Sequence, residues 1–129
     1  MSEPIYLTDV TELGPEVAEF LEAGLLILFQ AGAPPELAEI AVLHEPISGP
    51  REDPPAAGDI LAIGTKEFRI TSVGSKAWQN IQDLGHAVFK FDGSHEVELP
   101  GQINVQAQGA ELLSQEIRPG VRVEIKAGA

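Results

Sequence analysis

Glycine and proline interrupt the whole chain and leave only short apolar stretches between them, with 13 glycines and 10 prolines in 129 residues. The longest apolar stretch, residues 23–29, is far below the roughly 20 residues that a helix needs to cross a bilayer. Short apolar or alternating stretches bounded by turn residues are typical of β-strands. The sequence therefore predicts a mainly β fold, a small barrel or sandwich of about eight or nine short strands with two or three short helices.

Each predicted strand is an alternating or uninterrupted apolar stretch beside a turn signal. The stretches span residues 5–10, 25–29, 40–44, 60–63, 67–73, 86–91, 96–99, 102–106 and 121–125. We expect residues 86–91 and 96–99 to form a hairpin across Asp92 and Gly93.

The predicted helices are short and begin or end at recognisable signals. Residues 16–22 are amphipathic, and the prolines at 34 and 35 favour a single helical turn. Ser75 is expected to cap a helix that Gly85 ends, with an apolar stripe formed by Ala77, Trp78, Ile81 and Leu84. Residues 45–59 hold four prolines and two glycines, so an exposed loop is expected there.

The length and composition predict a single domain over residues 1–129. Aromatic residues make up only 5% of the chain, so the core must be aliphatic, and stacking platforms for single-stranded nucleic acid are not expected. The chain has no cysteine, which excludes a thiolate nucleophile, a disulfide framework and a cysteine-ligated zinc site. The first ten residues lack the basic start of a signal peptide, so a cytoplasmic protein is expected.

The net charge of -12 is unevenly distributed along the chain. Residues 1–50 contain nine carboxylates and no lysine or arginine, and all eight basic residues lie between Arg51 and Lys126. Nucleic acids and anionic membranes are therefore poor partners, because phosphate binding depends on clustered basic side chains. A protein partner with a basic face would be steered toward the acidic half.

Histidine is the remaining candidate for nucleophilic chemistry. The chain contains no phosphate-binding glycine loop, nucleotide fingerprint, HExxH motif or serine elbow, and no cofactor is expected. His44 is predicted at the end of an apolar strand, beside the proline-rich loop and accessible to solvent. A neutral imidazole there could attack phosphorus with one nitrogen while the other is held by a hydrogen bond.

The other two histidines have weaker predicted roles. His86 follows a helix stop and could lie near His44, where it would stabilise phosphate oxygens by donating a hydrogen bond. His95 is expected to be solvated. A metal site formed by His86, His95 and either Glu96 or Glu98 matches no ligand motif, and a small hydrolase using a carboxylate pair with His86 also lacks a motif.

Several segments together resemble the glucitol/sorbitol-specific IIA component of the bacterial sugar phosphotransferase system. They are Ile70-Thr71-Ser72-Val73-Gly74-Ser75, Leu84-Gly85-His86, Phe89-Lys90-Phe91-Asp92-Gly93 and Leu99-Pro100-Gly101, in matching order and spacing. Upstream, Leu26-Ile27-Leu28-Phe29, Gly32-Ala33-Pro34 and Leu37 are similar to the same family. The likeness is looser over residues 1–24 and 45–58.

The resemblance implies a cytoplasmic phosphocarrier with a small, dimeric β-barrel fold. Such a carrier accepts a phosphoryl group on histidine from the phosphocarrier HPr and passes it to a cysteine of a IIB domain, which serves a membrane IIC subunit. By position the resemblance assigns the acceptor role to His44. Some members carry a second histidine shortly afterwards, where this chain has Glu45, Pro46 and Ile47. The alternative function is a regulatory or sugar-sensing module that keeps the barrel without phosphoryl transfer.

Overall fold

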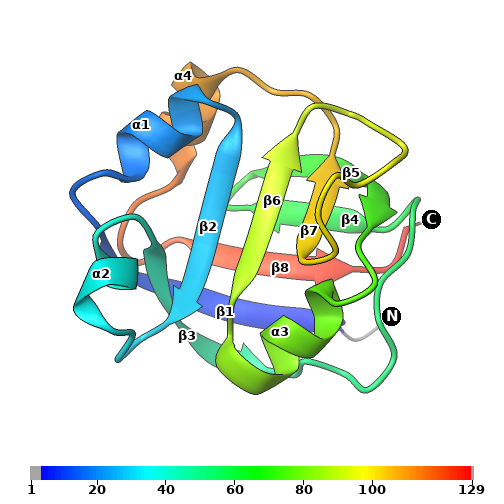
Figure 1. Cartoon of the computed structure of the whole chain (residues 1–129), viewed down its shortest axis with the longest axis horizontal. Coiled ribbons are helices and arrows are strands. Elements are labelled where there is room, and N and C mark those ends of the chain that lie inside the picture. The colour runs from blue at the N-terminus through cyan, green and yellow to red at the C-terminus, as the bar shows by residue number, and fades with distance from the viewer. Residues whose placement is uncertain (1–3, 129) are drawn as a thin grey trace.

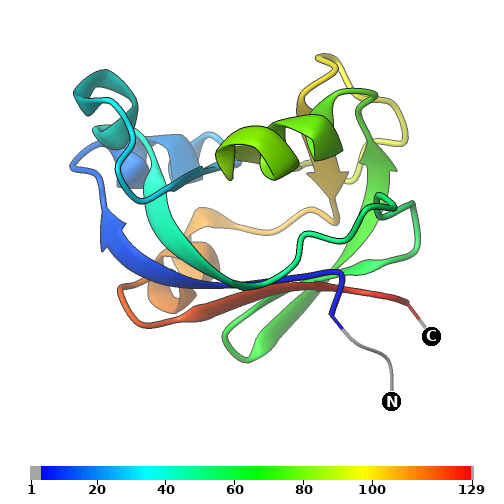
Figure 2. The same cartoon turned by 90° about the horizontal axis from the view of Figure 1, so that it is seen from below.

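Eight strands close into a barrel in the computed structural model, which describes residues 4–128 (Figures 1 and 2). In chain order the elements are β1 (Tyr6–Leu13), α1 (Val17–Glu22), β2 (Leu25–Gln30), α2 (Pro35–Ala38), β3 (Val42–Ser48), β4 (Ile60–Ile63), β5 (Lys66–Val73), α3 (Ala77–Leu84), β6 (Ala87–Phe91), β7 (Gln102–Val105), α4 (Ala110–Glu116) and β8 (Arg122–Lys126). The predicted mainly β barrel is therefore confirmed. The described residues form four short helices, one more than the largest number expected.

The strand order around the barrel is β1-β3-β2-β6-β7-β5-β4-β8, and β8 returns to pair with β1. The β2–β3 and β6–β7 pairs are parallel, and the other pairs are antiparallel. A parallel pair needs a crossover connection, which α2 provides between β2 and β3. This crossover brings the start of β3 beside the end of β2.

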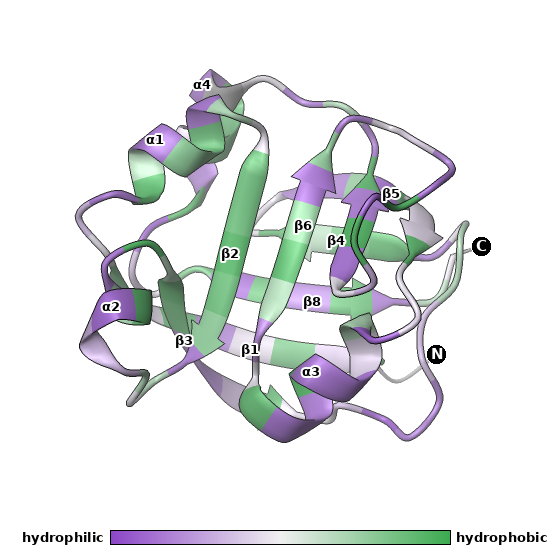
Figure 3. Cartoon of the chain, viewed as in Figure 1, coloured by the Kyte–Doolittle hydropathy of each residue, from purple (hydrophilic) through white to green (hydrophobic). Residues whose placement is uncertain are grey.

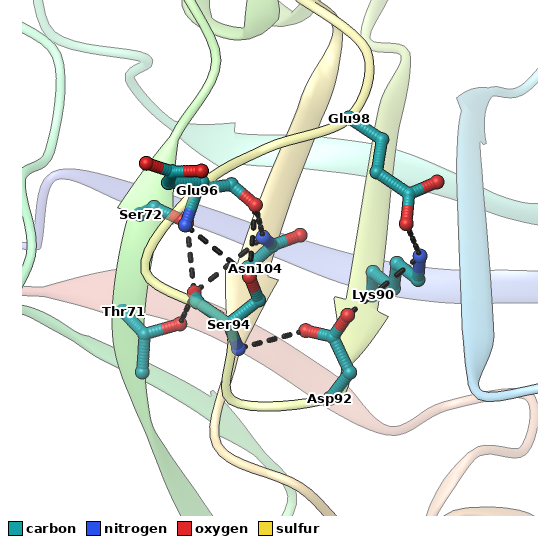
Figure 4. Close-up of polar contacts among 8 residues, drawn as sticks. All are labelled: Thr71, Ser72, Lys90, Asp92, Ser94, Glu96, Glu98 and Asn104. Atoms are coloured by element: carbon teal, nitrogen blue, oxygen red, sulfur yellow. Dashed lines mark hydrogen bonds and ion pairs between the residues drawn. The ribbon is translucent and has the colours of Figure 1, made fainter.

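The hairpin predicted from residues 86–91 and 96–99 is wrong. β6 pairs with β2 and β7, and residues 96–99 form no strand. Side chains of neighbouring strands hold this loop instead (Figure 4). The Ser94 carbonyl accepts hydrogen bonds from the Thr71 and Ser72 hydroxyls at 2.6 and 3.0 Å, and Asn104 Nδ2 donates to the Glu96 carbonyl at 3.0 Å. These loop carbonyls are thus hydrogen-bonded to side chains, although the loop pairs with no strand.

Two local predictions also differ from the structure. The N-cap of α3 is Lys76 and makes no side-chain capping bond, so Ser75 does not cap the helix. Leu84, expected in the apolar stripe of α3, is 50% exposed. Helix α4 was not predicted, because its sequence offers neither a capping side chain nor a wide apolar face. Within the described residues, no helix has the length and apolarity needed to cross a membrane.

The interior of the barrel is mostly aliphatic, as the composition predicts. Its fully buried side chains include Leu26 and Leu28 of β2, Ile70 of β5, Phe89 of β6 and Ile103 of β7. Figure 3 shows that β2 is almost entirely apolar along its length. Four polar side chains are buried among the described residues, namely Thr8, His44, Gln102 and Asn104. Thr8 and His44 form a hydrogen bond with each other.

Candidate functional site

His44 lies inside the barrel wall and not at an exposed strand end. It is the third residue of β3, opposite Val10 of β1 on one side and Gln30 of β2 on the other, and its exposed fraction is 0%. The predicted solvent access is wrong because β3 continues through Pro46 to Ser48 and pairs with β1 along this length. Alternate residues of a strand share a face, so the inward position of Val42 places His44 inward as well.

Both ring nitrogens of His44 are engaged in short hydrogen bonds. Nε2 lies 2.6 Å from the carbonyl oxygen of Gly85, and Nδ1 lies 2.6 Å from Oγ1 of Thr8. A carbonyl oxygen can only accept, so Nε2 carries the hydrogen in this contact. In the neutral ring Nδ1 then holds the lone pair and accepts from the Thr8 hydroxyl. The geometry thus assigns the tautomer as well as the orientation of the imidazole.

The surroundings of His44 favour its neutral form. Burial lowers the pKa of the imidazole below its ordinary value of 6.5, and the hydrogen bond to the Gly85 carbonyl opposes this effect only in part. Glu45, the next residue, is exposed, because successive side chains of a strand point to opposite faces. The carboxylate of Glu45 therefore lies on the other side of β3 from the ring.

Acidification is expected to destabilise the protein through His44. The folded state has the lower pKa, so between that pKa and about 6.5 the unfolded chain binds the extra proton and is favoured as the pH falls. We expect the free energy of unfolding to fall on acidification below about pH 6.5, with a contribution from this site of at most about 1.4 kcal/mol per pH unit. Urea unfolding at several pH values checks this.

The matched control for this pH dependence is the His44→Gln protein, which keeps every other titrating group. Its overall stability will differ from that of the wild type. The informative quantity is therefore how far the wild-type free energy of unfolding exceeds that of the variant at each pH. That difference should shrink on acidification. If the free energies of unfolding of the two proteins follow parallel curves between pH 8 and pH 5, His44 binds protons equally in the folded and unfolded states.

His86 lies beside the same corner of the barrel, immediately before β6. The Gly85 carbonyl that holds His44 belongs to the preceding residue, so the structure brings the two histidines together at the junction of α3 and β6. His86 is half-buried, its Nδ1 lies 3.1 Å from the Leu28 carbonyl, and its ring lies 5.0 Å from that of Phe29. Nδ1 must donate to that carbonyl, so in the neutral ring the lone pair is on Nε2. No described residue forms a hydrogen bond with Nε2.

Thr8 and Tyr6 complete the site and were not singled out from the sequence. The Tyr6 ring meets that of His44 edge-on at 6.1 Å, and its Oη is buried without a hydrogen-bond partner among the described residues. Burial raises the pKa of Tyr6 to about 12, and the nearby Thr8 hydroxyl lowers it to a smaller extent. The available signal was the period of two along β1, which turns residues 6, 8 and 10 inward.

His95 lies apart from this corner, exposed in the loop between β6 and β7. It lines an open depression of about 500 Å³ together with Trp78 and the hydroxyl-bearing residues Thr71, Ser72 and Ser75. Across residues 4–128, no group of three or more histidine, aspartate or glutamate side chains is placed to hold a metal ion. The sequence-based grouping of His86 and His95 with nearby glutamates therefore forms no ligand cluster in the described chain.

Comparison with known proteins identifies relatives of this chain over nearly its whole length. The family model described as "PTS system glucitol/sorbitol-specific IIA component" matches residues 5–124. The chain belongs to this family. Glucitol/sorbitol-specific EIIA components of Shigella flexneri and Escherichia coli (strain K12) are 34% identical to it over 116 residues, covering 90% of this chain and 89% of each relative.

A solved structure also matches this IIA component. The crystal structure of a PTS system IIA component from Enterococcus faecalis V583 superposes with a TM-score of 0.74 at 25% sequence identity, and it covers 94% of this chain and 99% of that one. The family predicted from the sequence motifs is thus confirmed over nearly the whole chain. The relatives support a role in the phosphotransferase system.

Proposed function

We propose that this IIA component carries a phosphoryl group on His44, accepting it from phosphorylated HPr and passing it to a cysteine of a IIB domain. The observation that carries the proposal is a neutral imidazole, held by hydrogen bonds at both nitrogens, in a chain of this family. On acceptance, a nitrogen lone pair of His44 forms a bond to phosphorus as the bond to the donor imidazole breaks. On transfer, the cysteine sulfur forms a bond to phosphorus as the bond to His44 breaks. Catalysis of this kind depends mainly on placement and electrostatics.

Acceptance on His44 requires a local opening of the structure. The ring is 0% exposed and Nε2 donates to the Gly85 carbonyl, so the phosphoryl group cannot approach it in this conformation. The junction of α3 and β6 is the segment that must move, because Gly85 lies there. We propose that docking of the donor protein shifts this junction and frees Nε2.

His86 is proposed as the neighbour that stabilises the transferred group. Its open Nε2 lies at the same junction, where a protonated ring could donate a hydrogen bond to a phosphoryl oxygen. The same observation supports a second candidate function for His86, that of the acceptor itself. Its Nδ1 is fixed by a carbonyl while Nε2 keeps its lone pair, which is the arrangement a histidine nucleophile needs.

The partners proposed for this carrier follow from charge and family. The exposed carboxylates Glu36 and Glu39 lie on and just after α2, on the crossover that leads into β3. A donor with a basic face would be steered to this side by long-range attraction. We propose HPr as that donor and a IIB domain, which serves a membrane IIC subunit, as the recipient, with the exchange in the cytoplasm. A homodimer is proposed on the family resemblance alone.

Labelling of the purified protein tests the proposed function against a regulatory or sugar-sensing module. Incubation with HPr carrying a radioactive phosphoryl group is expected to transfer about one label per chain, since one histidine accepts it. The label should be lost in acid and kept in base, as a phosphohistidine is. A chain that binds phosphorylated HPr without taking label would instead be a binding module.

A further inference from the structure

The Thr8 hydroxyl has a position that the proposed transfer alone does not explain. Thr8 lies on β1 with an exposed fraction of 0%, inside a barrel whose other inward residues on this strand include Tyr6 and Val10. A buried hydroxyl costs free energy unless it is paired, and its partner here is Nδ1 of His44 at 2.6 Å. The two residues are 36 positions apart in the chain, so the fold creates this contact.

We propose that Thr8 is a positioning residue whose hydroxyl donates to Nδ1 of His44 in the resting state and accepts from it when Nε2 takes the phosphoryl group. This inference rests on the proposed function. It deepens that function by assigning a residue that the sequence did not single out.

Before phosphorylation, the Gly85 carbonyl sets the direction of the hydrogen bond between Thr8 and His44. Because that oxygen can only accept, it holds the hydrogen on Nε2 and leaves the lone pair on Nδ1, where the Thr8 hydroxyl donates to it. In this tautomer Nε2 has no lone pair to attack phosphorus. The contact with Gly85 therefore keeps the nitrogen that faces the α3–β6 junction inactive until the two separate.

When Nε2 attacks phosphorus, the chemistry of the imidazole reverses the hydrogen bond between Thr8 and His44. For Nε2 to attack, its proton passes to water once the Gly85 contact opens, and Nδ1 takes a proton from water, so the ring stays neutral. The Nε2 lone pair then forms the bond to phosphorus while the bond to the donor imidazole breaks and returns its electron pair there. Nδ1–H now needs an acceptor, and a hydroxyl can reverse its role where an amide or ammonium donor could not.

Tyr6 provides a partner for the reversed hydroxyl. When Thr8 accepts from Nδ1–H, its own hydrogen needs an acceptor inside the barrel. The Tyr6 Oη is buried, lies near Thr8 and has no hydrogen-bond partner among the described residues. The phenol can either donate or accept, so the pair of hydroxyls can serve both states of the ring.

Thr8→Val tests the proposal, with Thr8→Ser as the matched variant that keeps the hydroxyl. Valine has nearly the shape of threonine but leaves Nδ1 unpaired in both states. We expect the maximal rate of labelling by phosphorylated HPr to fall by at least about tenfold, with the half-saturating HPr concentration unchanged, as expected for the loss of one buried hydrogen bond. Thr8→Ser should stay within about threefold of the wild type.

Nitrogen NMR of the unphosphorylated wild type supplies a readout independent of transfer and of any variant. We expect the proton on Nε2 of His44 and a hydrogen-bonded lone pair on Nδ1. A proton on Nδ1, or a Thr8→Val protein labelled at the wild-type rate, would overturn the inference. Should Thr8→Val not fold, the spectrum and the Tyr6→Phe protein, expected to label more slowly, still decide it. A wild type that takes no label refutes the proposed function, whereas the spectrum tests the hydrogen bond alone.

Discussion

The His44→Gln protein is expected to take no measurable label from phosphorylated HPr, while the His86→Gln protein is labelled about tenfold to hundredfold more slowly. Glutamine has no nucleophilic nitrogen, yet its amide can donate to the Gly85 carbonyl and its oxygen can accept from Thr8. The substitution therefore removes the chemistry with little change in polarity. At His86 only a hydrogen-bond donor to the phosphoryl group is lost under the proposed assignment.

The control for both variants is His95→Gln, because His95 is exposed in a loop away from the two other histidines. It should label like the wild type. Unfolding curves of all three variants show whether the barrel is intact. Label retained in His44→Gln and lost in His86→Gln would move the acceptor to His86, in line with the open Nε2 and the greater exposure of that ring.

Most strands and helix ends could be predicted because they depend on local sequence patterns. The alternation along residues 121–125 and the uninterrupted apolar stretch 25–29 became β8 and β2. Gly85 ends α3 in the left-handed conformation that glycine favours. These features depend on neighbours in sequence, and they specified the barrel class before the strand order was known.

Strand pairing between distant segments could not be predicted in the same way. Residues 86–91 and 96–99 have the local signature of a hairpin, but β6 is already paired on both sides, with β2 and β7. The same limitation applied to β3, which crosses Pro46 because β1 offers a partner along its length. Proline within a strand normally argues for a boundary, and here the pairing overrides that preference.

The site was predicted in its residue type but not in its environment. His44 was the nucleophile left after other chemistries were excluded, and the family resemblance gave it a role. Its burial was missed because the two hydrogen bonds that hold it span 36 and 41 positions of the chain. No local pattern marks Thr8 or the Gly85 carbonyl as partners of an imidazole, so only the folded structure could identify them.

The Gly85→Ala protein is expected to lose about 2–5 kcal/mol of its free energy of unfolding. Gly85 has φ of 62°, a left-handed conformation that costs a residue with a Cβ about 1–2 kcal/mol. The added Cβ would also lie 2.7 Å from the Cβ of Gln30 on β2, so one of the two segments must shift. Overpacking of this kind typically adds about 1–3 kcal/mol. Urea unfolding measures this loss of stability as a lower midpoint concentration, and the slope of the free energy against urea concentration should be unchanged.

Gly32→Ala isolates the backbone part of this effect. Gly32 has φ of 96° with nothing within 4 Å of an added Cβ, so its alanine variant is expected to lose only about 1–2 kcal/mol. The excess in Gly85→Ala then reports the collision with Gln30. Equal losses in the two variants would mean that the α3–β6 junction yields to the new Cβ at little cost. A junction that yields so easily could also release Nε2 of His44 without a docked partner, so this comparison measures how firmly the resting histidine is held.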